Sequence, residues 1–251
     1  QNAFSSFDHR IFYAMKANSN QDLLALMKKL DVGLDAVSIH EVRIGLEAGF
    51  SADNIIFTPN GVPFDELEQA IELGARLNIE NLSYLEKLGE AYRSDVPCTL
   101  RVHPGLVLPN ASRDATGWYQ RSRFGIDRKQ LEEARRIIDL HGIRVEGLHI
   151  HSSSIILDEA VFGTVAEVLL DLARDLPDVR ILDLGGGVRP PYQPDDDHPD
   201  LDALASCLQE PLEHFEQQTG RKLQLWFEPG RYLVAESGVL LTRVNVLKEV
   251  G

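Results

Sequence analysis

The chain has 251 residues, of which 43% are hydrophobic and 25% are charged, a composition typical of a globular protein and unlike that of disordered or collagen-like chains. Its formal net charge of −14 disfavours nucleic acid and anionic membrane surfaces as partners, because both would repel it. No apolar run reaches the roughly 18–20 residues that a membrane span needs, and the start lacks the basic and apolar regions of a signal peptide.

Short β-rich runs alternate with helical stretches along the chain. The eight runs that we expect to be strands are residues 11–15, 34–38, 54–58, 77–82, 98–102, 145–151, 180–184 and 223–227. Alternating βα units form a parallel sheet with right-handed crossovers. Eight such units predict a closed (β/α)8 barrel of the TIM type, and an open doubly wound sheet is the alternative.

The segments between these runs have helical patterns. Residues 21–30 carry apolar side chains at the spacing of one helix face. Pro63 at the first helical position and Gly74 just past the end delimit a second helix. The other helices that we expect lie around 131–138, 157–174 and 200–218.

Two long loops and a C-terminal run fall outside this alternation. The loop 190–200 contains three consecutive aspartates, for which we prefer a solvated surface position over a metal site. The insert 104–123 has the length of a functional or mobile loop. We assign residues 1–237 to the barrel, and we expect the β-rich run in 238–251 to leave it as a strand toward a β-domain outside this chain.

The two cysteines predict no disulfide. Cys98 and Cys207 are far apart in the sequence and form no CxxC pair. A reducing cytoplasm fits this usage best.

Chemically versatile residues gather at the carboxyl ends of the predicted strands, where barrels place their active sites. They are Lys16, Asp35, Ser38, Arg101, His103, His149, His151, the serines 152–154, Gly185, Gly186, Gly187, Glu228, Gly230 and Arg231. Independent loops would not concentrate such residues at one end by chance.

The lysine and the glycines among them suggest a cofactor with an aldehyde and an anionic group. If Lys16 is buried, its pKa is lowered and its amine is free to form a Schiff base, whereas a snorkelling surface lysine is the alternative. Gly185, Gly186 and Gly187 let backbone N–H groups approach a phosphate closely. Ser154 and Arg231 would add a hydroxyl and a guanidinium to the same anion.

The carboxylate and the histidines suggest a site for an aromatic ring. A buried Glu228 needs a partner, either a pyridinium nitrogen or a salt bridge to Arg231 or Arg101. His149 and His151 share one face of their strand, so a metal site and, for His149 alone, a packing role are alternatives. Taken together, the lysine, anion loop, carboxylate and imidazole describe pyridoxal 5′-phosphate (PLP).

The same residues lie in motifs that resemble those of the fold-type III, alanine-racemase-fold PLP-dependent decarboxylases. The motifs are residues 12–19 (Phe-Tyr-Ala-Met-Lys-Ala-Asn-Ser), 147–154 (Gly-Leu-His-Ile-His-Ser-Ser-Ser), 182–187 (Leu-Asp-Leu-Gly-Gly-Gly) and 228–231 (Glu-Pro-Gly-Arg). Within that family, residues 56–60, 78–83 and 121–126 are similar to the bacterial diaminopimelate decarboxylase branch.

The resemblance implies a role for each site residue. Lys16 would hold the cofactor aldehyde, His151 would stack on the pyridine ring and Glu228 would pair with the ring nitrogen. Arg101 would support the ring site, and Asp35 matches a family position near the lysine. The residues that would bind the phosphate are Ser154, Gly185, Gly186, Gly187, Gly230 and Arg231.

The chain departs from the family pattern at three points. Ser153 stands where the family usually has glycine, and Arg123 replaces a usual lysine. The family's C-terminal β-domain, with its Cys-Glu/Asp motif and tyrosine, has no counterpart in this sequence.

The function implied by the resemblance is a PLP-dependent carboxy-lyase that converts meso-diaminopimelate into L-lysine and CO2 in lysine biosynthesis. The family further implies a homodimer with shared active sites and an amino-acid substrate. The alternatives are decarboxylation of ornithine, arginine or carboxynorspermidine, a non-catalytic single-barrel PLP-binding protein, and a metal-dependent hydrolase that uses the histidine pair.

Overall fold

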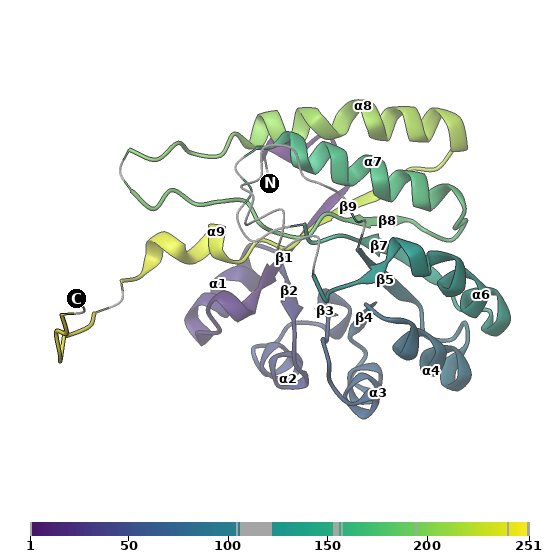
Figure 1. Cartoon of the computed structure of the whole chain (residues 1–251), viewed down its shortest axis with the longest axis horizontal. Helices are drawn as coiled ribbons and strands as arrows, with labels where there is room; N and C mark the ends of the chain where they lie inside the picture. The colour runs from purple at the N-terminus through teal and green to yellow at the C-terminus, as the bar shows by residue number, and fades with distance from the viewer. Residues whose placement is uncertain are drawn as a thin grey trace.

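Eight parallel strands form a closed barrel with helices outside it (Figure 1). The computed structural model describes residues 2–103, 105, 122–152, 156, 158–193, 195–239 and 241–249. The barrel strands are β1 (His9–Ala14), β2 (Gly33–Ala36), β3 (Ile55–Phe57), β4 (Arg76–Ile79), β5 (Cys98–His103), β7 (Val145–His149), β8 (Ile181–Asp183) and β9 (Gln224–Phe227).

The pairing of β4 with β5 closes the sheet. The strand order is β4-β3-β2-β1-β9-β8-β7-β5, and every pair in it is parallel. The two-residue β6 (Ile126–Asp127) is added beside β5. The predicted (β/α)8 barrel is confirmed, and the open sheet is excluded because such a sheet leaves two unpaired edges.

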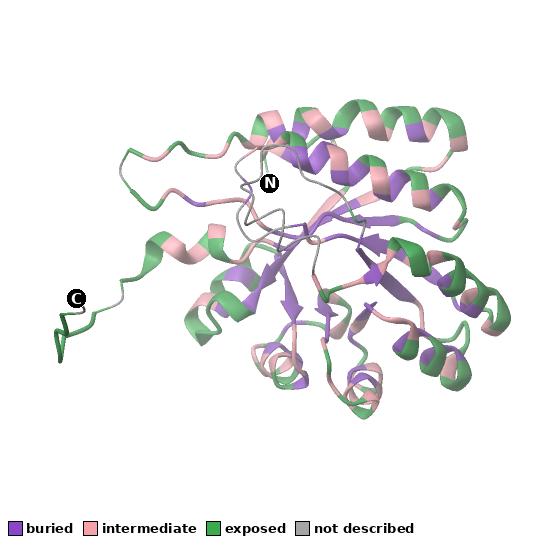
Figure 2. Ribbon diagram, in the orientation of Figure 1, coloured by how far each residue is buried: buried purple, intermediate pink, exposed green. Residues whose placement is uncertain are grey.

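Within the described residues, seven helices lie on the outside of the barrel, and each buries part of its surface against it (Figure 2). They are α1 (Gln21–Lys29), α2 (Ile39–Glu47), α3 (Phe64–Glu72), α4 (Leu82–Tyr92), α6 (Leu131–His141), α7 (Ala160–Arg174) and α8 (Leu201–Thr219). The short α9 (Arg231–Val234) has no buried residue. Side chains of Asn20, Ser38, Asn81 and Asp200 cap four of the seven helices at the amino end. Pro63 is the residue before α3 rather than its first residue, and Gly74 ends the helix with φ +82° as predicted.

The barrel interior has an apolar floor. Phe12, Ile56, Ile181 and Trp226 form a separate buried cluster there. Gly33 makes room for it, because a Cβ at this position would lie 2.5 Å from the Phe12 ring. Side chains alternate along a strand, so every second residue points to the same side. Asp35 therefore follows Gly33 on that side, and Asp183 follows Ile181. Asn78 on β4 and His149 on β7 are further buried polar residues.

The segment after α9 projects away from the barrel (Figure 1). Residues 238–239 and 241–249 form no strand within this chain, and their large apolar side chains are 72–89% exposed. The strand toward a β-domain stays a prediction. A strand needs a neighbour for its backbone hydrogen bonds, and the described chain provides none there. No helix within the described part of the chain combines the length and apolar character that a membrane crossing requires.

Candidate functional site

A cavity of about 300 Å³ opens at the carboxyl ends of β1, β8 and β9. Six residues predicted from the sequence line it: Lys16, His151, Gly187, Glu228, Gly230 and Arg231. Four further lining residues, Ala14, Ala17, Val188 and Tyr232, had not been predicted. The predicted clustering at one end of the barrel is therefore present in the structure.

Lys16 is held by a neighbouring carboxylate. It lies in the turn after β1, and its Nζ donates a hydrogen bond to Oδ2 of the buried Asp35 on β2, at 2.6 Å. Burial alone would lower the pKa of Lys16, but the charges of Asp35 and Glu228 outweigh burial and raise it. The expectation of a lowered pKa applied to a buried lysine, whereas the Lys16 side chain is half-exposed. The two carboxylates that raise its pKa come from β2 and from the end of β9, and the local sequence does not show them.

Glu228 is buried just after β9, and its partner is neither Arg231 nor Arg101. Its Oε2 lies 3.3 Å from Nε2 of His149, which is also buried. Burial raises the pKa of Glu228, but His149 and Lys16 outweigh it and hold that pKa below its usual range. Glu228 is therefore an anion at neutral pH, and its Oε1 has no hydrogen-bond partner among the described residues.

His151 faces the cavity as a neutral imidazole. Its Nδ1 accepts a hydrogen bond from the backbone N–H of Gly186 at 3.1 Å. Burial, together with the charge of Arg101, lowers the pKa of His151 to about 3. The ring is therefore uncharged near neutral pH, and its orientation is fixed by the loop after β8.

Glycine is needed after β8 and after β9 because neighbouring atoms lie too close to the backbone there to leave room for a side chain. A Cβ on Gly186 would lie 2.3 Å from the carbonyl oxygen of Glu228, and Gly185, with φ +66°, packs against His151. A Cβ on Gly230 would lie 2.9 Å from that of Ala14. These glycines bring three strand ends together, and Gly187 and Gly230 leave backbone exposed to the cavity.

Arg101 lies beside the site rather than in its lining. Its Nη1 is 3.8 Å from Oε2 of the buried Glu80, and its guanidinium lies over the Phe124 ring. Glu80 also accepts a hydrogen bond from Asn60. Arg101 is thus oriented by contacts from β4 and from the segment before β6.

The remaining predictions have mixed outcomes. Ser154 and Ser153 lie outside the described residues, as does most of the insert 104–123. Within the described ranges, the one group spaced to hold a metal ion is His149, Asp183 and Glu228. This group contains His149 but not His151, whose Nδ1 accepts a hydrogen bond from the backbone N–H of Gly186.

Two other predictions concern residues away from the cavity. Asp196, in the run of three aspartates, forms an ion pair with Arg189, with Oδ2 and Nη2 2.8 Å apart. Cys98 and Cys207 are both free, as predicted.

Sequence reasoning did not single out Asp183, and for His149 it weighed a metal site and a packing role but not a contact with Glu228. Asp183 is a carboxyl between Leu182 and Leu184 on a buried strand, and this isolated charge was the available signal. Its partners are contributed by β7 and β9 and are not visible in the local sequence.

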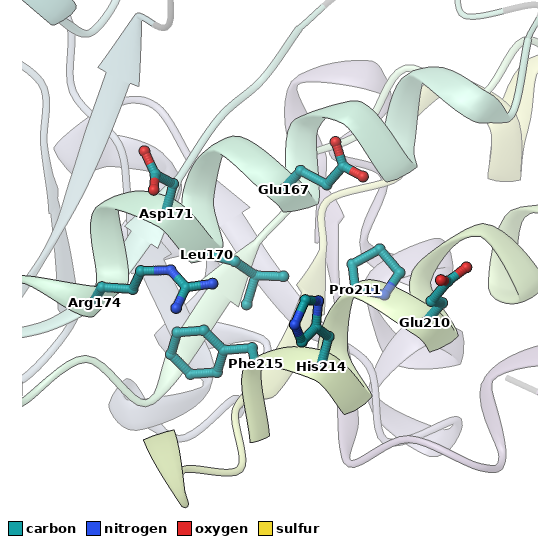
Figure 3. A pocket seen from close by; sticks show the side chains of 8 residues that line it. All are labelled: Glu167, Leu170, Asp171, Arg174, Glu210, Pro211, His214 and Phe215. Atoms are coloured by element: carbon teal, nitrogen blue, oxygen red, sulfur yellow. The ribbon is translucent and has the colours of Figure 1, made fainter. Parts of the chain in front are cut away.

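A second hollow, of about 360 Å³, lies between α7 and α8 on the outside of the barrel (Figure 3). Its lining residues are Glu167, Leu170, Asp171, Arg174, Glu210, Pro211, His214 and Phe215. None of the predicted site residues belongs to it.

Fold and site together define a barrel enzyme class in which a lysine and a glycine-rich loop meet at the barrel mouth. Comparison with known proteins specifies the class. Residues 1–235 match the family described as "Pyridoxal-dependent decarboxylase, pyridoxal binding domain", so this chain belongs to the pyridoxal-dependent decarboxylase family.

Curated relatives are diaminopimelate decarboxylases. The chain is 34% identical to that of Methanothermobacter thermautotrophicus, over 96% of this chain and 57% of the relative. It is 33% identical to that of Streptomyces coelicolor, over 96% and 55% respectively. The chain thus spans somewhat more than half the length of these relatives.

Solved structures agree with this family. A crystal structure of a diaminopimelate decarboxylase matches with a TM-score of 0.83 and 29% identity, over 100% of this chain and 60% of that one. The Helicobacter pylori enzyme complexed with L-lysine matches with a TM-score of 0.79 and 28% identity, over 94% and 60%.

The cofactor of this family is PLP, and the residues around the cavity fit it. Glu228 offers a buried, unpaired carboxylate oxygen to a ring N–H. Lys16 offers an amine to an aldehyde at the same cavity, and Gly187, Gly230 and Arg231 offer backbone and a guanidinium to a phosphate.

Proposed function

We propose that the protein to which this chain belongs decarboxylates meso-diaminopimelate to L-lysine and CO2. The observation that carries the proposal is the presence of the Lys16 amine and the anionic Glu228 in one cavity, with Asp35 in contact with the amine. Support for the substrate comes from the relatives, which are diaminopimelate decarboxylases.

The chemistry that PLP supplies when bound is an electron sink for the pair left behind when a carboxyl group departs as CO2. Glu228 would face the ring nitrogen of the cofactor, because an anion at that position stabilises the protonated form of the ring. His151 would lie against the ring as a neutral imidazole. Lys16 would hold the cofactor through its aldehyde.

Asp35 sets the charge on Lys16. The phosphate would be held by the backbone of Gly185 to Gly187 and of Gly230, by Arg231 and, from the family resemblance alone, by Ser154. Arg101 supports the ring site from the side, through its contact with Glu80. These roles cover the residues to which the family resemblance assigns a part.

The assembly and the location are also proposals. A homodimer with shared active sites follows from the family resemblance, as does a barrel domain that ends near residue 237. Two free cysteines, one of them buried, fit a reducing cytoplasm.

The test is product formation from competing substrates. The purified protein, loaded with PLP, is incubated in parallel with meso-diaminopimelate, ornithine, arginine and carboxynorspermidine, and CO2 and amine products are quantified. We expect L-lysine from meso-diaminopimelate as the dominant product, and near-complete loss of turnover in Glu228→Ala with cofactor still bound. Faster turnover of another substrate would overturn the assignment, and bound cofactor without any turnover would favour the non-catalytic alternative.

A further inference from the structure

Asp183 is a buried carboxyl that the proposed chemistry leaves without a task. It ends β8, is 1% exposed and does not line the cavity. Its Oδ1 accepts a hydrogen bond from the backbone N–H of Gly185 at 2.9 Å. Its Oδ2 has no hydrogen-bond partner among the residues that the structure describes.

This carboxyl belongs to a compact buried group behind the cavity. Ligand-type atoms of His149, Asp183 and Glu228 all lie within 4.8 Å of one another. Of the three, only Glu228 reaches the cavity. Two carboxyl groups this close in a dry interior do not both ionise, because neither is compensated by water.

The surroundings decide which of the two carboxyl groups keeps the proton. Glu228 contacts His149 at 3.3 Å and faces Lys16, and both favour its anion. Among the described residues Asp183 forms no ion pair, and burial followed by the charge of Glu228 raises its pKa well above the usual range. The neutral acid is therefore Asp183 and the anion is Glu228.

The backbone joins the two groups through one residue. Gly185 donates its N–H to Asp183 and accepts the backbone N–H of Glu228 at 2.8 Å. His149 is fixed from behind, since its Nδ1 contacts the Asn78 amide. Glu228 is thus bracketed by a carboxyl from β8 and an imidazole from β7.

We propose that Asp183 is a positioning residue that retains the proton of this carboxyl pair and donates it in a hydrogen bond to Glu228, which then presents its charge to the ring nitrogen of the cofactor. The proposal rests on the role proposed above for Glu228. It assigns to Asp183 an action through Glu228 and no contact with cofactor or substrate.

The first experiment needs no cofactor. The carboxyl carbons of aspartate are labelled with ¹³C in the 251-residue chain, and Asp183→Asn assigns the Asp183 signal by its loss. We expect this signal to stay in its protonated position between about pH 5 and 8, where an ordinary aspartate with a pKa near about 3.9 is ionised. An ionised signal throughout that range would overturn the proposal.

The second experiment uses the cofactor and two variants. Asp183→Asn keeps a neutral group that accepts from Gly185 and donates to Glu228, whereas Asp183→Leu removes both functions at similar volume. We expect PLP affinity and the pH profile of its near-visible absorption band to be retained within about threefold in Asp183→Asn. In Asp183→Leu we expect affinity to fall about tenfold or more and the pH profile of the band to shift.

Asp175→Asn is the matched control, because it removes an exposed aspartate that pairs with Arg135 on the outside of the barrel. Equal damage in Asp183→Asn and Asp183→Leu would overturn the proposal, because an anionic role would then be indicated. If Asp183→Leu fails to fold, the Asp183→Asn variant and the ¹³C titration still test whether Asp183 keeps the proton. If neither the wild type nor any variant bound PLP, the proposed function would be contradicted. The ¹³C titration would still test the protonation of Asp183, because it needs no cofactor.

Discussion

Lys16 and Asp35 lie on neighbouring strand ends, with Nζ and Oδ2 2.6 Å apart, and this contact sets the charge of the amine. The Lys16 side chain is 49% exposed, whereas that of Asp35 is buried. Burial and Glu228 raise the pKa of Asp35, but at this separation the proton of the pair resides on the lysine. The resting amine is therefore an ammonium with a buried counter-ion.

Replacement of Asp35 should change the pH at which Lys16 reacts. Asp35→Asn removes the carboxylate that raises the pKa of Lys16, so the unprotonated amine forms at lower pH. We predict that the midpoint of the pH profile for reaction with PLP moves down by about one unit, followed by absorbance. Asp175→Asn is the control, and an unchanged or higher midpoint for Asp35→Asn would contradict this account of the pair.

Gly186→Ala should destabilise the protein through a backbone clash. The new Cβ would lie 2.3 Å from the carbonyl oxygen of Glu228, so the loop after β8 or the end of β9 must move. We predict a loss of about 1–3 kcal/mol in the free energy of unfolding, measured with urea. Gly238→Ala is the control, because a Cβ there meets nothing within 4 Å. If the two variants were equally stable, the backbone of Gly186 would lie further from the Glu228 carbonyl oxygen than the structure shows.

Arg231→Ala should weaken binding of the phosphate rather than of the ring. Arg231 lines the cavity with Gly187 and Gly230, and its Nη1 also donates to the Tyr192 hydroxyl at 3.2 Å. We predict about tenfold weaker binding of PLP but less than about twofold weaker binding of pyridoxal, by titration calorimetry. Arg135→Ala, on the outside of α6, is the control. Equal losses for both ligands would remove Arg231 from the phosphate site.

Stability should fall in mild acid because of His151. Its pKa in the folded chain is about 3, below the unfolded value of 6.5, so the unfolded chain binds the proton first. The stability contributed by the neutral His151 ring is therefore fully present above about pH 6.5 and is lost as the pH falls toward about 3. Between pH 7 and 5 the loss amounts to at most about 2 kcal/mol. Urea unfolding of the wild type and His151→Phe at both pH values measures it, and an equal pH dependence in the two proteins would contradict it.

Most of the fold could be predicted because its strands leave a strong sequence signal. A strand in a closed barrel is buried on both faces, so it reads as a short apolar run, and all eight runs became strands. The two-residue β6 is too short to carry a pattern. The run after residue 237 has the pattern of a strand, but a pattern does not supply the neighbouring strand that would pair with it.

The site could be predicted in position but only partly in chemistry. Polar residues at strand ends are conspicuous, which identified Lys16, His151 and Glu228. Their protonation depends on partners from other strands, and local sequence does not show these. The rise in the pKa of Lys16 and the contacts of His149 and Asp183 with the group around Glu228 were therefore not foreseen.

The central claim is that Lys16 anchors PLP in this cavity. The direct measurement is the intact mass after incubation with PLP and borohydride reduction, followed by peptide mapping. The account predicts a single phosphopyridoxyl group on Lys16 and none in Lys16→Ala. An adduct on another lysine, or no adduct in protein shown to be folded, would contradict it.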